Sequence, residues 1–145
     1  MTKTTIRQAK PSDWPFIESW RAGHFLEMAA RMKYPRPVTG QKKLGEAIWV
    51  VMEREGVPTA AASFETDEDA RITFFYDLYA ASGHVLDALA LGKMLEEMCD
   101  KNRLEMRIST DPENHKYIRL MEKRGYVPVS LELKRQPRGV DDGRK

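Results

Sequence analysis

The hydrophobic pattern in the first half of the chain predicts one helix among four short strands. Apolar residues recur at helical spacing from Trp14, directly after Ser12-Asp13, a pair suited to cap the start of a helix. This helix should end near Tyr34, because Pro35 and Pro37 cannot continue it. Continuous or alternating apolar runs predict strands at residues 4–9, 48–52, 59–65 and 72–79.

The second half of the chain alternates helices with strands. After Ser82-Gly83 the apolar period changes from two residues to 3.6, which predicts a helix over residues 85–101. Asp111-Pro112 is suited to begin another helix, and Gly125 is a natural stop that ends it at Arg124. Apolar alternation predicts two further strands, at residues 104–108 and 127–133.

The order of these elements predicts an α/β fold, in the mixed-sheet (α+β) form. Consecutive strands in the first half suit antiparallel hairpins, whereas the strand–helix–strand units that follow must supply parallel strands. The chain has 145 residues, the usual size of one domain. We therefore expect a single three-layer domain over residues 1–135, followed by a flexible C-terminal tail over residues 136–145.

Composition and charge exclude several classes of function. The formal net charge is only +2, and acidic and basic residues are mixed along the chain, so no nucleic-acid partner is expected. No apolar run approaches the roughly 20 residues of a membrane span, and the N-terminus has no signal-peptide core. Cys99 lies in an apolar helical stretch, which indicates a buried thiol in a cytoplasmic protein. The three histidines have no ligand spacing, so no metal is expected.

Three stretches of the sequence are similar to parts of a known family. Residues 6–14 (IRQAKPSDW) match its first strand and the start of its first helix. Residues 114–126 (NHKYIRLMEKRGY) match its last helix, which an Asn opens and a Gly-aromatic pair closes. Residues 72–79, with the helix that follows from His84, occupy the place of its acetyl-CoA site. Over roughly residues 4–135 the chain thus resembles the GNAT (GCN5-related N-acetyltransferase) superfamily.

The resemblance implies a GNAT-like fold and a site for acetyl-CoA. In the family, a Gln/Arg-x-x-Gly-x-Gly/Ala loop offers free amides to the pyrophosphate, since unpaired N–H groups at a helix start favour an anion. The best match here runs from Asp87 to Gly92, with a carboxylate in place of the basic or amide residue, where it would oppose the phosphates. The residues implied in cofactor binding are His84, Val85, Ala90, Gly92 and Asn114.

Catalytic candidates follow from the same resemblance and from the residue types. The family tyrosine that protonates the CoA thiolate lies about seven residues after the Asn, where this chain has Met121. Tyr117 and Tyr126 are the nearby substitutes, unless both pack against the sheet. For the general base we expect Asp77, a carboxylate among apolar residues whose pKa burial would raise, or else Glu65; either can instead be a strand-end carboxylate facing water.

Three functions are consistent with these features. The first is an acyl-CoA-dependent N-acetyltransferase that acts on a small-molecule or protein amine. The second is a catalytically inactive GNAT-fold protein with a structural or assembly role and protein partners, which Asp87 and Met121 favour. Residues 114–120 are similar to the last helix of GNAT-like proteins of tailed bacteriophages, so such a protein would be a virion component. The third is an unrelated α/β binding module.

Overall fold

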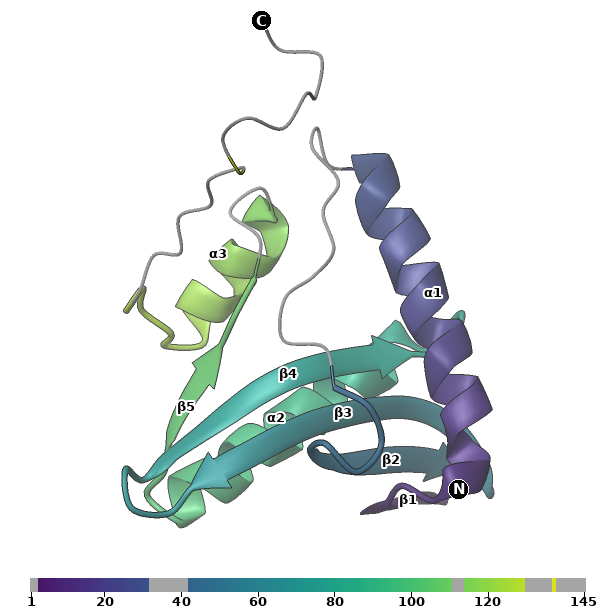
Figure 1. The fold of residues 1–145 in the computed structure, drawn as a ribbon, viewed down its shortest axis with the longest axis horizontal. Coiled ribbons are helices and arrows are strands. Elements are labelled where there is room, and N and C mark those ends of the chain that lie inside the picture. The colour runs from purple at the N-terminus through teal and green to yellow at the C-terminus, as the bar shows by residue number, and fades with distance from the viewer. Residues whose placement is uncertain (1–2, 32–41, 111–113, 130–136, 138–145) are drawn as a thin grey trace, which may run out of the picture. The chain divides into compact units, whose positions relative to one another are not determined.

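A computed structural model describes residues 3–31, 42–110, 114–129 and 137 of the chain (Figure 1). Two compact units, Met1–Asn114 and His115–Lys145, are described separately. The elements in chain order are β1 (Thr4–Gln8), a 3-10 helix (Pro11–Asp13), α1 (Trp14–Arg31), β2 (Ile48–Arg54), β3 (Val57–Asp67), β4 (Ile72–Ala80), α2 (Val85–Lys101), β5 (Glu105–Ile108) and α3 (His115–Lys123).

The first unit contains one mixed five-stranded sheet, in the order β1-β2-β3-β4-β5. The first three pairs of neighbouring strands are antiparallel, and β4 and β5 are parallel. Helix α2 connects the two parallel strands, as a parallel pair requires, because a tight turn cannot reverse the chain twice. The predicted α/β class with a mixed sheet is therefore confirmed.

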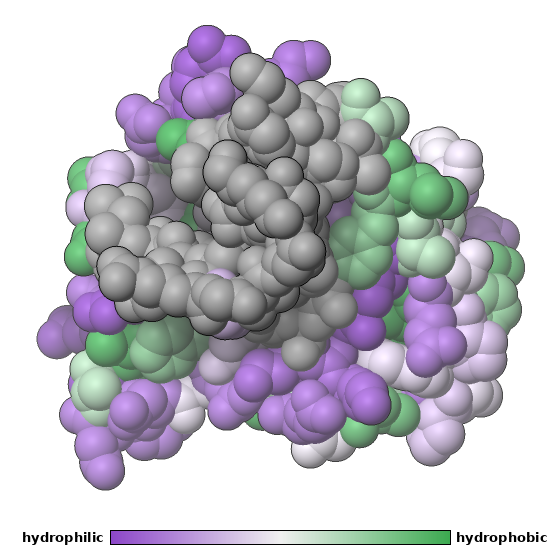
Figure 2. Space-filling view, turned by 45° about the horizontal axis from the view of Figure 1, so that its top comes forward, coloured by the Kyte–Doolittle hydropathy of each residue, from purple (hydrophilic) through white to green (hydrophobic). Residues whose placement is uncertain are grey.

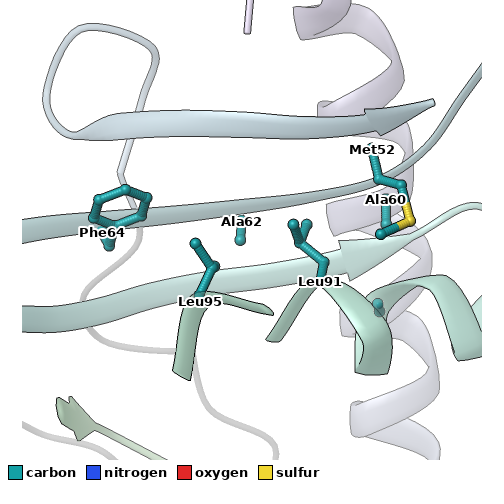
Figure 3. Packing of buried hydrophobic residues seen from close by; sticks show 7 residues of the cluster. Met52, Ala60, Ala62, Phe64, Leu91 and Leu95 are labelled. Carbon is teal, nitrogen blue, oxygen red and sulfur yellow. The ribbon is translucent and has the colours of Figure 1, made fainter. Parts of the chain in front are cut away.

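Helices α1 and α2 cover opposite faces of this sheet. On one face Ala60, Ala62 and Phe64 of β3 pack against Leu91 and Leu95 of α2 (Figure 3). The alternate residue of β3, Ala61, lies on the other face with Ile17 of α1, Trp49, Val51 and Tyr79. The three alanines are at most 1% exposed, so their small side chains let both helices approach the sheet closely. This arrangement is the predicted three-layer organisation.

The last helix ends as its sequence predicts. Gly125 has φ of 95°, a conformation that glycine adopts without steric cost. Its N–H donates to the carbonyl of Glu122 at 3.0 Å, and the N–H of Tyr126 donates to that of Met121 at 3.1 Å. These two bonds form a Schellman motif and satisfy carbonyls at the end of α3.

The predicted strand over residues 127–133 is wrong in its described part. Val127 and Val129 belong to no strand and are 73% and 65% exposed. Pro128 between them has no N–H to donate to a neighbouring strand, which disfavours pairing of this segment inside a sheet. Four other predictions lie outside the described residues: the end of the first helix near residue 34, the cap at 111–112, the rest of this strand, and the tail from residue 136, of which only Pro137 is described. The domain boundary at residue 135 therefore stays a prediction.

Leu91 provides a test of this packing. Leu91 is fully buried against the sheet, whereas Leu86 on the same helix is 74% exposed. We expect Leu91→Ala to lower the free energy of unfolding by about 2–5 kcal/mol, because it leaves a cavity in a packed core. The control, Leu86→Ala, should change it by less than about 0.5 kcal/mol. Urea unfolding of both variants checks this, and equal losses would contradict the assigned core face of α2.

Candidate functional site

The edge of β4 is open where β4 and β5 separate. The two strands pair only between Ile72–Phe75 of β4 and Glu105–Ile108, and Figure 1 shows them diverging beyond this point. Among the described residues, no strand pairs with residues 76–80 of β4 on that side. Their outward backbone N–H and C=O groups can therefore pair with an extended ligand. We call residues 76–80 the open edge.

A β-bulge lies at the beginning of the open edge. Ser63 pairs with Asp77, but the next residue of β3, Phe64, pairs with Phe75, so Tyr76 is an extra residue in β4. One extra residue reverses the face on which the following side chains lie. Phe75 accordingly packs on the α2 face of the sheet, while Asp77 contacts Arg21 of α1 on the opposite face.

Asp77 is buried within a set of hydrogen-bond donors. Its Oδ2 accepts from Ser63 Oγ at 2.6 Å and from the backbone N–H of Lys42 at 3.2 Å. Its Oδ1 accepts from the Tyr79 hydroxyl at 2.7 Å and lies 3.5 Å from a terminal nitrogen of Arg21. Burial, together with the neighbouring Asp77, raises the pKa of Tyr79 well above its usual range. Because its oxygens are occupied, Asp77 can accept a further proton only if one of these bonds breaks.

Arg21 completes this buried polar group, and it was not anticipated from the sequence. Its guanidinium carbon lies 5.4 to 5.7 Å from the ring centroids of Trp14, Trp49 and Tyr79. A terminal nitrogen donates to the carbonyl of Lys42 at 2.6 Å. The available signal was its position four residues after Ile17, which places a charged residue on the apolar face of the helix. Arg21 and Asp77 thus hold both backbone groups of Lys42.

A second, more exposed polar group lies beside the bulge. The ammonium of Lys42 lies 3.8 Å from Glu65 Oε1 and 4.6 Å from the centroid of the Tyr76 ring. The side chain of Glu65 is 46% exposed. Burial and the charge of Glu65 raise the pKa of the Tyr76 phenol above its usual value. We call Lys42, Glu65 and Tyr76 the bulge cluster.

Helix α2 begins after the open edge, and its first turn leaves two amides for a ligand. In the described chain, the N–H of His84 donates to Ala81 and that of Asp87 donates to His84, both at 2.9 Å. The N–H groups of Val85 and Leu86 at the first two helical positions have no intrahelical acceptor. They lie at the positive end of the α2 dipole, which favours an anion.

Asp87 does not oppose an anion as an isolated carboxylate would. Three hydrogen bonds from Arg54 of β2, at 2.6 to 2.9 Å, hold its two oxygens, and His84 Nδ1 lies 3.4 Å away. These bonds from Arg54 are the main reason that the pKa of Asp87 falls to about 2; hydrogen bonds from Thr59 and His84 add to the effect. The expectation that its charge faces a ligand is therefore corrected, because the carboxylate is buried and balanced by Arg54.

The structure places the remaining predicted residues as follows. Ala90 and Gly92 lie inside α2, where backbone N–H groups are used within the helix. Gly92 packs beside Leu78, since a Cβ built there would lie 3.6 Å from a Leu78 methyl carbon. Asn114 closes the first unit and donates from its side chain to Thr110 Oγ1 at 3.2 Å. Tyr117 and Tyr126 belong to the second unit.

Cys99 is a core residue. It is fully buried, as predicted, and burial raises the pKa of its thiol. In the described ranges, no three His, Cys, Asp or Glu side chains lie close enough together to hold a metal ion. The described helices also include none that is long and apolar enough to cross a bilayer.

The Arg54–Asp87 pair should make stability depend on pH in a defined window. The folded pKa of Asp87, about 2, lies below the value of roughly 3.9 for an unfolded aspartate. Its contribution is therefore complete above about pH 4 and is lost as the pH falls towards 2. We expect Asp87→Asn to cost about 1–3 kcal/mol at pH 7 and progressively less below pH 4.

Chemical unfolding of the wild type and Asp87→Asn at pH 7 and pH 3 measures this difference. Asp100→Asn is the matched control, because Asp100 lies exposed on the same helix. It should change stability little at either pH. A cost of Asp87→Asn that stays the same at both pH values would show that the charge of Asp87 is not its source.

Comparisons with known proteins give matches only among solved structures. No family model matches the chain, and no curated protein matches it. A possible acetyltransferase from Clostridium difficile 630 is 13% identical with a TM-score of 0.64, over 92% of this chain and 97% of that one. A GCN5-related N-acetyltransferase from Ralstonia eutropha JMP134 is 14% identical with a TM-score of 0.60, over 92% and 99%. AAC(6')-Iy, solved in complex with the bisubstrate analog CoA-S-monomethyl-acetylneamine, is 12% identical with a TM-score of 0.58, over 94% and 99%.

These likenesses extend over almost the whole chain at low sequence identity. They bear on the arrangement of the elements and not on individual site residues. They do not address the bacteriophage resemblance, which stays a prediction. The chain has the fold of the GCN5-related N-acetyltransferases, as predicted.

Proposed function

We propose that the protein is an acetyl-CoA-dependent N-acetyltransferase whose acceptor is a small-molecule or protein amine. The observation that carries this proposal is the open edge of β4, which begins where β5 diverges and leads to the free amides of α2. The acetyltransferase fold and the CoA analogue in one similar structure support it. Direct attack by a bound amine needs no covalent enzyme intermediate and gains mostly from proximity and orientation.

The open edge suits the arm that links the thioester of acetyl-CoA to its pyrophosphate. Its five residues span roughly 17 Å at about 3.3 Å per residue. The amide groups of the arm can pair with the free backbone groups of the edge, as an added strand would. The thioester then lies beside Phe75 and Ile108, because the pairing of β4 with β5 leaves no open edge beyond them.

The first turn of α2 would hold the pyrophosphate. The N–H groups of Val85 and Leu86 point out of the helix start, and His84 beside them has a side chain that is 43% exposed. Ala90 and Gly92 would contribute small side chains rather than amides. We also retain Asn114 as a candidate contact with the cofactor.

Glu65 is a better general base than Asp77. The half-exposed Glu65 side chain beside the bulge can accept a proton from an attacking amine, directly or through water. The oxygens of Asp77 are instead occupied by donors that attach α1 and Lys42 to the sheet. Tyr117 and Tyr126 are the candidates from the sequence for protonating the departing thiolate.

A structural or assembly role is the alternative, and the surface of α2 favours it. Val85 and Leu86 are 65% and 74% exposed at the start of the helix, and Leu89 is 37% exposed. Apolar side chains of this kind occur at protein interfaces. On the face shown in Figure 2, however, hydrophobic residues form small areas among hydrophilic ones. Acetyl-CoA binding separates the two functions.

Charges placed at Leu86 should change acetyl-CoA affinity in opposite directions. We expect Leu86→Glu to weaken binding and Leu86→Lys to strengthen it by about fivefold each, since one charge near the pyrophosphate contributes about 1 kcal/mol. An acidic residue at a helix start stabilises the helix, so unfolding cannot explain the weaker binding. Calorimetry at low ionic strength measures the affinities.

Two controls accompany this measurement. Leu86→Gln is the neutral variant at the same position, and Leu26→Glu places the same charge on α1, where Leu26 is 75% exposed. Both should bind acetyl-CoA like the wild type. Equal affinities for the two charged variants would remove α2 as the phosphate site. No heat from the wild type up to millimolar acetyl-CoA would contradict the proposed function and favour the assembly role.

Glu65→Gln should separate chemistry from binding. The amide cannot accept the amine proton, so we expect acetyl transfer to fall by about 10²-fold or more while acetyl-CoA affinity stays the same. Release of CoA thiol in the presence of a panel of amines measures the transfer. Glu68→Gln is the control, because Glu68 is an exposed carboxylate in the turn after β3. Full activity of Glu65→Gln would exclude Glu65 as the base.

A further inference from the structure

Tyr76 lies at the inner end of the open edge. It is the extra residue of the bulge, and it directly follows Phe75, the last residue of β4 that pairs with β5. An arm that pairs along the open edge would therefore bring its reactive end to the backbone of Tyr76. This placement rests on the proposed function.

The Tyr76 ring is held in place by its neighbours. It is partly buried, and the Lys42 ammonium lies over it at 4.6 Å from the centroid. The backbone of Lys42 is itself attached to Asp77 and Arg21, at 3.2 and 2.6 Å. The charged groups that act on the Tyr76 phenol are Glu65 and Lys42. Since burial and Glu65 raise its pKa, the phenol keeps its proton at neutral pH.

The other described tyrosine of the first unit is already engaged. Tyr79 is buried, and its hydroxyl donates to Asp77 Oδ1 at 2.7 Å on the α1 face. Its proton is therefore used in holding Asp77. Tyr76 is the phenol that the described part of this unit offers next to the end of β4–β5 pairing.

We propose that Tyr76 donates a hydrogen bond to the sulfur of CoA and supplies the proton that the departing thiolate takes up. The amine nitrogen bonds to the thioester carbon, and the carbon–sulfur bond breaks with its electron pair on sulfur. The phenol proton passes to sulfur, while the proton lost by the amine passes through Glu65 or water and restores the phenol. The products are the N-acetylated amine and CoA with a free thiol.

Comparison of CoA with desulfo-CoA tests this role without knowledge of the acceptor. A thiol titrates near pH 8.5, so CoA presents mainly a thiolate at pH 9 to 9.5, where the wild-type phenol is still protonated. We expect the wild type to bind CoA more tightly than desulfo-CoA at this pH. In Tyr76→Phe this preference should fall by about tenfold or more, because a hydrogen bond to a charged group is lost. Calorimetry with both ligands measures the ratio.

The controls separate this proposal from the proposed function. Tyr79→Phe makes the same substitution away from the open edge and should leave the ratio unchanged in variants that unfold normally with heat. A ratio that does not fall in Tyr76→Phe, or that falls in Tyr117→Phe or Tyr126→Phe instead, would overturn the role of Tyr76. If neither CoA nor desulfo-CoA binds the wild type, the proposed function itself fails.

Discussion

The extra residue in β4 is the constraint on which the rest of the first unit depends. Side chains of a strand alternate between the two faces of a sheet, so one inserted residue moves every later side chain to the other face. The bulge at Tyr76 puts Asp77 on the face covered by α1. There Asp77 gathers donors from β3, β4, α1 and the segment at Lys42. The same bulge coincides with the end of β4–β5 pairing and so with the start of the open edge.

Two buried carboxylates show how this fold accommodates charge. A carboxylate removed from water is costly unless donors surround it, and both Asp77 and Asp87 are surrounded. Asp77 uses neutral donors together with Arg21, and Asp87 uses Arg54. Each attaches a helix to the sheet, α1 in the first case and α2 in the second. Residues that looked like a base and a departure from a phosphate loop thus have clear structural roles.

The fold by itself does not establish the activity, because one fold can carry many functions. What supports acetyl transfer here is local: unpaired strand backbone, two free amides at a helix start, and a carboxylate and a phenol at the bulge. The chemistry needs no more than these groups, since a thioester is already activated towards an amine. The exposed apolar start of α2 is consistent with either binding of CoA or contact with a protein.

The sequence by itself determined the elements whose signals are local. The change of hydrophobic period predicted α2 with its observed bounds, and Gly125 predicted the end of α3, because helix spacing and a left-handed cap depend on neighbouring residues. The tertiary structure alone decided the site. Arg54 and Asp87 are 33 residues apart, Arg21 and Asp77 are 56 apart, and the bulge exists only in the register between β3 and β4. Such contacts arise from strand pairing and helix packing, which no local pattern records, so Asp87 looked repulsive and Tyr76 was not noticed.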